Sequence, residues 1–309
     1  MQRKLISFDW AIKRILRSKA NFDILEGFLS ELLFEDITIL EILESESNQE
    51  QRDDKFNRLD IKVKNHKEEI LLIEIQYDRE MDYIQRILYA ASKAIVEHMK
   101  ESEPYFKVTK IISISILYFD FGDGDDYIYK GTTNFVGLHN KTLLHLDAKQ
   151  KELYKTENIE KIYPEYYLIK VRNFNDNSKD TLDEWINFLK NEEIPENPKA
   201  KGLRKAKETL DYLKMDNDER LAYNRYQMSL RDQASAYEST YVIGKIEGKK
   251  EGRIEAEAEA NKKLKKMVES LLNANIDTKT IKLSTGLSDV ELANLTNQWK
   301  SEVNSTTMD

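Results

Sequence analysis

The stretch RLDIKVKNHKEEILLIEIQ, residues 58–76, decides the fold because two apolar strand patterns flank a short polar segment. Isoleucine, leucine and valine dominate both halves, and the segment NHKEE between them is polar throughout. Such runs on either side of a polar segment predict a β-hairpin. Asp60, Glu74 and Gln76 are polar residues within these apolar or alternating runs, so their positions need an explanation beyond strand formation.

The expected register of the hairpin brings these polar residues together. A turn centred on Lys67 places Asp60 directly opposite Glu74. Residues opposed in this way share one face, with Cβ atoms about 4.5 to 5.5 Å apart. Gln76 lies two residues beyond Glu74 and therefore points to the same side. One extra residue in the turn would break this pairing.

Two opposed carboxylates repel each other unless a cation or a shared proton lies between them. The chain has no cysteine and only four histidines, so a metal site has to use oxygen ligands. Mg²⁺, or alternatively Mn²⁺, held by Asp60 and Glu74 fits this requirement. Gln76 would orient a water or a phosphate, and the backbone carbonyl of Ile75 is a further predicted ligand.

The alternative interpretation is that these side chains lie on the solvent face of an amphipathic hairpin. That alternative explains Lys62 and Lys64, which share the facing of Asp60. It explains Glu74 less well, because Glu74 interrupts the run ILLIEIQY, which is apolar on both faces. The pattern of residues leaves both interpretations open.

Composition sets the protein class. The 309 residues are 40% hydrophobic and 10% aromatic, which is enough to bury at least one sizeable core. A formal net charge of −8 argues against a globally basic nucleic-acid binder, but enzymes that act on DNA can confine positive charge to one face. The first residues have no long apolar core of the kind a signal peptide contains, and no apolar run of 18 residues occurs in the sequence. We therefore expect a cytoplasmic protein without membrane contact.

The rest of the N-terminal part alternates helical and strand patterns, which predicts an α/β or α+β core of helices and a sheet. A long amphipathic helix at 80–100 precedes the run VTKIISISILYF, which is typical of a central strand covered on both faces. The other predicted helices are 8–17, 21–34 and 180–190, and the other predicted strands are 127–137, 142–147 and 165–174.

From Pro195 onward, Lys, Glu and Ala with helical spacing replace the strand patterns, which predicts a domain 1–195, a helical region 196–270 and a small helical segment 271–309. Small residues recur every four positions at Gly244, Gly248, Gly252, Ala256 and Ala260. Such a stripe permits close approach of a second helix, most economically from a second copy of the chain, but a solvated helix is the alternative. Two short helices around STGLS resemble a helix-turn-helix, with Thr278 and Ser288 as expected N-caps.

The hairpin motif resembles the signature of the Rpn group, the recombination-promoting nucleases, in which an Asp is followed further along by Glu-x-Gln. This group belongs to the PD-(D/E)XK nuclease superfamily. The segments FDWAIKRIL, YIQRILYAASKAI and LRDQASAYESTYVIGKIEGKKEG are also similar to the group. The resemblance thus covers essentially the whole chain.

The resemblance implies an α/β fold, a restriction-endonuclease-like core with a mixed sheet flanked by helices, followed by an all-α C-terminal half. It also implies that Asp60 and Glu74 bind Mg²⁺, and that Gln76 takes the place of the usual Lys. An amide cannot act as a general base, so the metal or a substrate phosphate would have to activate the water. Leu59 stands where the superfamily has its Pro.

The resemblance further suggests an additional acid from the first helices. Asp9 in FDWAIK matches the helix start of the group, and Glu26 is an alternative that we expect to be a surface residue or a cap. The helix after the hairpin matches an Arg-x-x-Tyr pattern that would approach DNA phosphate or brace the site. The residues with an expected phosphate contact are Arg86, Tyr89, Lys62 and Lys64.

The sequence and the resemblance together predict a Mg²⁺-dependent DNA endonuclease that acts in recombination or in defence against mobile DNA. The C-terminal helices are expected to form a homodimer. The main alternative is a catalytically silent protein that keeps the nuclease fold for DNA binding or assembly, although such a protein need not keep Asp60, Glu74 and Gln76. Cleavage of RNA is a second alternative.

Overall fold

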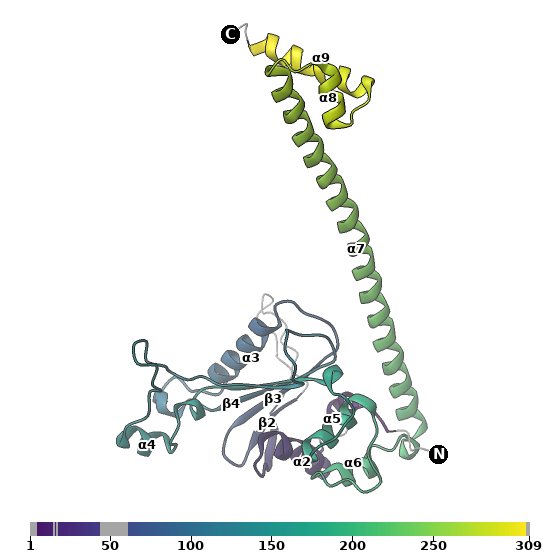
Figure 1. Cartoon of the computed structure of the whole chain (residues 1–309). Coiled ribbons are helices and arrows are strands. Elements are labelled where there is room, and N and C mark those ends of the chain that lie inside the picture. Colours follow the sequence, from purple (N-terminus) through teal and green to yellow (C-terminus); the bar gives the residue numbers. More distant parts are fainter. Residues whose placement is uncertain (1–4, 15, 17, 44–60, 307–309) are drawn as a thin grey trace. The chain divides into compact units, whose positions relative to one another are not determined.

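The structure is a computed structural model that describes residues 5–14, 16, 18–43 and 61–306. Figure 1 shows an N-terminal part with a sheet and helices, followed by helices alone. The strands are β1 Ile39–Leu43, β2 Ile61–Asn65, β3 Ile70–Gln76, β4 Ile111–Leu117, β5 Ile128–Gly131 and β6 Glu165–Lys170. The α-helices are α1 Phe8–Arg14, α2 Phe22–Leu33, α3 Tyr83–Glu97, α4 Ala148–Tyr154, α5 Thr181–Asn191, α6 Leu203–Thr209, α7 Asn217–Asn273, α8 Thr278–Thr285 and α9 Asp289–Thr306.

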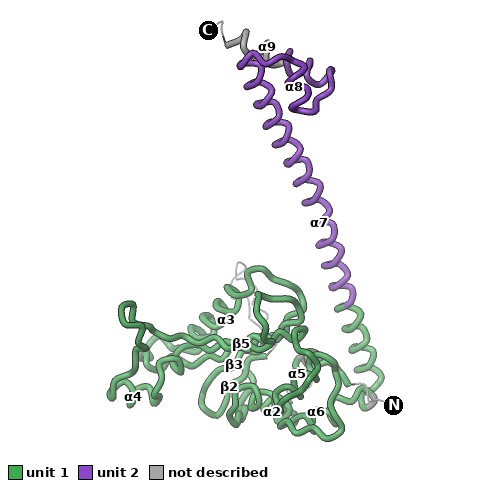
Figure 2. Tube along the Cα trace, in the orientation of Figure 1, with its two compact units in different colours: residues 1–230 green, residues 231–309 purple. Residues whose placement is uncertain are grey.

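The chain divides into two compact units, Met1–Leu230 and Arg231–Asp309 (Figure 2). The first unit contains the sheet and the helices up to the first part of α7. The second contains the rest of α7 together with α8 and α9. The division into three parts at 195 and 270 that the sequence suggests stays a prediction.

The strands of the described residues form one mixed sheet in the order β1-β2-β3-β4-β6-β5. Neighbours β3, β4 and β6 run parallel, and the outer pairs are antiparallel. β4 is buried along its whole length, as expected for VTKIISISILYF, since it lies between two parallel strands and is covered on both faces. The predicted fold class, a mixed sheet flanked by helices and followed by an all-α region, is confirmed.

The β2–β3 hairpin has the register that the sequence predicts. Ile61 pairs with Ile73, and the antiparallel pairing continues in step toward the turn. A turn centred on Lys67 requires this register. Asp60 directly precedes β2 and lies outside the described residues.

Asn65 fixes the turn between the two strands. Its side-chain oxygen accepts hydrogen bonds from the backbone N–H groups of Lys67, at 3.0 Å, and Glu69, at 2.9 Å. Its side-chain nitrogen donates to the Glu69 carboxylate at 2.7 Å. Glu68 takes a left-handed conformation with φ of 63°, which closes the turn. Asn65 is fully buried, so one amide organises the whole connection.

Different helices cover the two faces of the sheet (Figure 1). Ile70 and Leu72 of β3 pack against the Ala90, Ala91 and Ala94 side of α3. The alternate residues of β3 belong to the main core, which includes side chains of α1, α2 and α5. Because successive strand residues face opposite ways, Glu74 and Gln76 belong to the α3 face.

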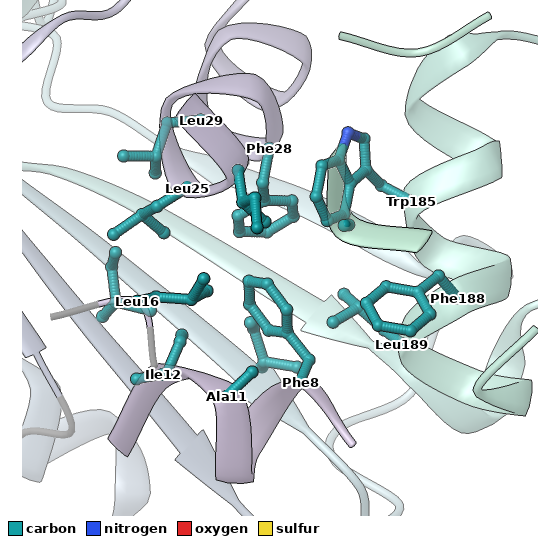
Figure 3. Close-up of a cluster of buried hydrophobic side chains, with 14 of the residues drawn as sticks. Phe8, Ala11, Ile12, Leu16, Leu25, Phe28, Leu29, Trp185, Phe188 and Leu189 are labelled. Atoms are coloured by element: carbon teal, nitrogen blue, oxygen red, sulfur yellow. The ribbon is translucent and has the colours of Figure 1, made fainter. Parts of the chain in front are cut away.

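The main core is dominated by aromatic side chains from helices that are far apart in sequence (Figure 3). Trp185 of α5 is fully buried and lies edge-on or tilted to Phe8, Phe28 and Phe188 at ring-centre distances of 5.5 to 6.1 Å. Its indole N–H donates to the Lys201 carbonyl at 3.0 Å. The core therefore ties α1 and α2 to α5 and to the segment that leads into α6.

Parts of the sequence-based assignment of elements are wrong. The strand expected at 142–147 is not a strand, since Leu143 forms only an isolated bridge with Val136. The strand expected at 127–137 is limited to β5. In both cases the apolar residues lie in a loop, where Leu138 and Leu144 are exposed. β1 was not predicted, because its short run directly follows a helix.

An ion cluster surrounds a buried carboxylate at the start of β6. The Glu165 carboxylate, 3% exposed as a residue, lies 3.0 Å from the ammonium nitrogens of Lys110 and Lys130 and 3.6 Å from that of Lys161. Burial alone would raise the pKa of Glu165, but its hydrogen bonds with Lys130 and Lys110 and the charges of these lysines lower it to about 2. Because this pKa is lower in the folded chain than its ordinary value, the free energy of unfolding depends on pH through Glu165.

We expect the stabilisation from Glu165 to be complete above pH 4.5, its ordinary pKa, and to be lost as the pH falls toward 2. Its size at neutral pH is up to about 3 kcal/mol. The free energies of unfolding of wild type and Glu165→Gln, measured by denaturant titration, should therefore differ at pH 7 and converge near pH 2.5. An equal difference at both pH values would show that the carboxylate charge does not matter.

The second unit has a small core of its own, in which Val268, Ile281 and Leu292 are buried. The predicted capping box of α9 is confirmed, because Ser288 N–H donates to the Glu291 carboxylate at 2.8 Å and Glu291 N–H donates to Ser288 Oγ at 3.3 Å. Helix α8 is capped by Asp277, one residue before the expected Thr278. No helix in the described part of the chain is both long and apolar enough for a membrane crossing.

Candidate active site

Glu74 is a buried carboxylate within the sheet, with a residue exposure of 3%. It pairs through β3 with Ser115 of β4, and its side chain reaches two residues of α3. One carboxylate oxygen forms an ion pair with the guanidinium of Arg86, and the other accepts a hydrogen bond from the Tyr83 hydroxyl at 3.3 Å. The strand thus presents Glu74 to α3, whose first two turns hold both of its oxygens.

Gln76 and Glu80 extend this cluster. Gln76 Nε2 donates to the Glu80 carboxylate at 3.0 Å and to the Asp78 carbonyl at 3.2 Å. The same oxygen of Glu80 accepts from Nη1 of Arg86 at 2.5 Å. Glu74, Arg86, Glu80 and Gln76 therefore form a ring of polar contacts that the backbone between Glu74 and Gln76 closes.

Burial and the charges around Glu74 shift the pKa values of its two partners, Tyr83 and Arg86. Burial and the negative charge of Glu74 raise the pKa of the Tyr83 hydroxyl, so Tyr83 remains a neutral donor to Glu74. Burial lowers the pKa of Arg86, but the charges of Glu74 and Glu80 outweigh it and raise the pKa overall. The two carboxylates and one guanidinium leave one net negative charge on this group.

The other residues with a predicted DNA contact lie on β2 and α3, and the two lysines among them pair with acids of the α3 C-terminus and of the hairpin turn. Lys62 is buried and forms an ion pair with Glu97 of α3 at 3.1 Å. Lys64 pairs with Glu68 of the turn at 2.5 Å. Tyr89 is 43% exposed on α3. The contacts of these side chains and of Arg86 with phosphate stay predictions.

The two candidate acids of the first helices differ in their surroundings. Asp9 of α1 is fully buried. Burial, and to a smaller extent the charge of Asp9, raise the pKa values of Tyr77 and Tyr118, which follow the carboxyl ends of β3 and β4. Its place in the site stays a prediction. Glu26 instead accepts a hydrogen bond from the backbone N–H of Ile39 at 2.8 Å, which anchors the start of β1.

The metal ligands expected from the sequence are described only in part. Glu74 is in place, and Ile75 lies between Glu74 and Gln76 with its side chain in the main core. Asp60 lies outside the described residues. In the described part of the chain, no three His, Cys, Asp or Glu residues cluster as metal ligands. The metal role of Asp60, Glu74 and the Ile75 carbonyl therefore stays a prediction.

Two partners of the predicted site residues, Tyr83 beside Glu74 and Glu80 beside Gln76, were not predicted as site residues. Tyr83 carries the signal of a core residue, because its apolar spacing matches the buried face of α3, and it is indeed buried. Glu80 lies in a polar connection, where an acid next to Asp78 and Asp82 attracts no notice. The only sequence signal for Glu80 is its distance of four residues from Gln76, which becomes informative once the chain is known to turn there.

Comparison with known proteins gives one match. Residues 6–240 match the family model described as PD-(D/E)XK nuclease family transposase. This range includes every strand of the sheet, the ring around Glu74 and the first part of α7. Neither a curated protein nor a solved structure gives a significant match to the chain.

Proposed function

Because this chain belongs to the PD-(D/E)XK nuclease family transposases, we propose that it is a Mg²⁺-dependent endonuclease that hydrolyses phosphodiester bonds of DNA. The observation that carries the proposal is the buried Glu74 carboxylate, held by Tyr83 and Arg86 beside Gln76. A carboxylate is rarely buried unless it is paired or binds a metal. Arg86 and Tyr83 supply this pairing for Glu74, and its position in a central strand beside Gln76 accords with the proposed metal role.

The donor set at Glu74 suits a hard divalent cation. All side-chain and backbone groups proposed as ligands are oxygens, which Mg²⁺ and Mn²⁺ prefer. A carboxylate offers about four lone-pair sites, and Arg86 and Tyr83 each use one. We propose that Glu74 holds the cation while it keeps both partners. The net negative charge of the ring favours this binding.

Asp60 is the proposed second ligand. Extending the Ile61–Ile73 pairing by one residue would pair Asp60 with Glu74. Its carboxylate would bring the formal charge of the group to −2, which a divalent cation balances. The carbonyl of Ile75 is a third proposed ligand, and Asp9 is a proposed additional acid.

The side chains of the site position the proposed ligands. The bound cation would polarise a phosphoryl oxygen and favour ionisation of water. Gln76 cannot accept a proton at neutral pH, so its role is to orient a ligand by hydrogen bonding. Tyr83 and Arg86 fix the rotamer of Glu74, and the place of Arg86 beside it suits Arg86 to the proposed contact with a phosphate.

DNA is the proposed substrate, since the family is one of nucleases and transposases. We further propose a role in recombination or in defence against mobile DNA, which accords with the cytoplasmic location expected from the sequence. The experiment is nicking of a supercoiled plasmid by wild type with Mg²⁺, with EDTA, and by Asp60→Ala. Cleavage only by wild type with Mg²⁺ or Mn²⁺ is expected. The catalytic proposal fails if wild type and Asp60→Ala nick the plasmid equally, or if neither cleaves DNA or RNA with any metal. The catalytically silent protein would then be the remaining alternative.

A homodimer through α7 is a second proposal, supported by the surface of this helix. Every residue from 231 to 263 is exposed, including Tyr241, Ile243 and Ile246, which are 52 to 62% exposed. A helical segment that buries no apolar face, such as 231–263 within α7, lacks the usual source of helical stability. A Cβ added at Gly244, Gly248 or Gly252 would meet no atom within 4 Å, so this stripe has room for a partner backbone.

Deletion of residues 238–309 is expected to convert a dimer into a monomer, as measured by sedimentation velocity. A double variant with Ile243→Glu and Ile246→Glu keeps the length of the chain and should have the same effect, because it places charge on the exposed apolar side of α7. Glu251→Gln serves as the control. A dimer that survives both changes would show that α7 does not hold the two copies together.

A further inference from the structure

We propose that Glu80 is a positioning residue that fixes the side-chain amide of Gln76 with its carbonyl oxygen toward the metal, which makes Gln76 an acceptor in the site. This inference rests on the proposed function and specifies the role of one of its residues. It distinguishes between two roles for Gln76, since an amide can donate to a phosphate through its nitrogen or accept from a water or bind a cation through its oxygen.

The orientation of the amide follows from its partners. Both neighbours of the outer atom of Gln76 are acceptors without a proton to give, namely the Glu80 carboxylate at 3.0 Å and the Asp78 carbonyl at 3.2 Å. An amide oxygen at this position would face two other oxygens, so the atom has to be the nitrogen. Both N–H groups are thereby used, and the carbonyl oxygen is the polar atom left for a ligand.

Glu80 contributes more to this orientation than Asp78 does. The bond from Gln76 to Glu80 is shorter and goes to a charged acceptor, and charge-assisted hydrogen bonds are about twice as strong as neutral ones. Arg86 in turn holds Glu80 at 2.5 Å and is held by Glu74. The orientation of Gln76 is therefore coupled to the carboxylate that is proposed to bind the metal.

A hydrogen-bond acceptor at position 76 fits the replacement of the usual Lys of the superfamily by Gln76. Gln76 lies two residues after Glu74, so its side chain stands on the same face of β3 as the Glu74 carboxylate. A neutral oxygen there adds a hard ligand, or a hydrogen-bond acceptor for water, without adding charge. A lysine ammonium would instead bring a positive charge into the site.

The experiment is Mn²⁺ binding to the full-length chain without DNA, measured by calorimetry and by the electron paramagnetic resonance signal of free Mn²⁺. Glu80→Ala removes the acceptor and is expected to weaken Mn²⁺ binding by about 10- to 100-fold, as is common for residues that orient metal ligands. Glu80→Gln keeps an oxygen that accepts the same bonds, so it should retain most of the affinity. Glu152→Ala on the exposed side of α4 is the matched control.

A double-mutant cycle separates action through Gln76 from action through Arg86. In a Gln76→Ala background, Glu80→Ala is expected to cause no further loss of Mn²⁺ affinity, because the residue it orients is gone. Additive losses, or equal losses in Glu80→Ala and Glu80→Gln, would overturn the inference in favour of a general charge effect. Unchanged affinity in Glu80→Ala would overturn it and leave the proposed function intact, whereas wild type that binds no Mn²⁺ would overturn both.

Discussion

Glu74→Gln is expected to lower Mg²⁺-dependent cleavage by about 1,000-fold or more, because loss of the proposed metal removes several kcal/mol of stabilisation of the transition state. The substitution keeps the shape of the side chain and its hydrogen-bonding oxygen. It removes the negative charge that faces Arg86, so we also expect a loss of about 1 to 3 kcal/mol in the free energy of unfolding. Arg86 retains Glu80, which limits this cost.

The two effects of Glu74→Gln have to be measured separately. Cleavage should be expressed per folded molecule, with the folded fraction taken from circular dichroism at the assay temperature. Glu41→Gln on β1, where the side chain is 55% exposed, is a control with the same change in charge. Full activity of folded Glu74→Gln would show that Glu74 serves only to hold Arg86, and the metal proposal would fail.

Trp185→Ala is expected to reduce the free energy of unfolding by about 3 to 5 kcal/mol. The indole is fully buried among three phenylalanine rings, so its removal leaves a large cavity (Figure 3). It also leaves the Lys201 carbonyl without the indole N–H. In a unit of this size such a loss corresponds to a decrease in Tm of roughly 6 to 20 °C in calorimetry.

Two further substitutions identify the cause of the Trp185→Ala effect. Trp185→Phe keeps most of the apolar volume and removes the N–H, and should cost only about 1 to 2 kcal/mol. Tyr105→Ala, at a residue that is 88% exposed, should change stability by less than about 0.5 kcal/mol. A Tm change in Trp185→Ala no larger than that of Tyr105→Ala would contradict the cavity argument.

Much of the fold is predictable from sequence where a pattern is determined locally. The hairpin register depends on alternation and on one turn, and both are visible in residues 58–76. The central strand β4 is visible because burial on both faces demands a continuous apolar run. The loop around Leu138 was mistaken for strands because apolar content alone does not show whether a segment finds a partner strand.

The candidate site was predictable on the strands but not on the helix that faces them. The alternation of side chains along a strand is enough to identify Glu74 and Gln76 as neighbours on one face. The partnership of Glu74 with Tyr83 depends on how α3 crosses the sheet, which no local pattern encodes. Arg86 was expected near the site through family resemblance, but its pairing with both Glu74 and Glu80 is a tertiary property.

The connection between β3 and β4 has a consequence for how the site opens. The two strands are parallel neighbours, and α3 is the helix that joins them across one face of the sheet (Figure 1). A helix tied to the sheet at both ends cannot swing away as a lid does. Tyr83 and Arg86, which lie at the start of this helix, therefore stay beside Glu74 without a movement of α3. We expect a site of this kind to be formed before its substrate arrives.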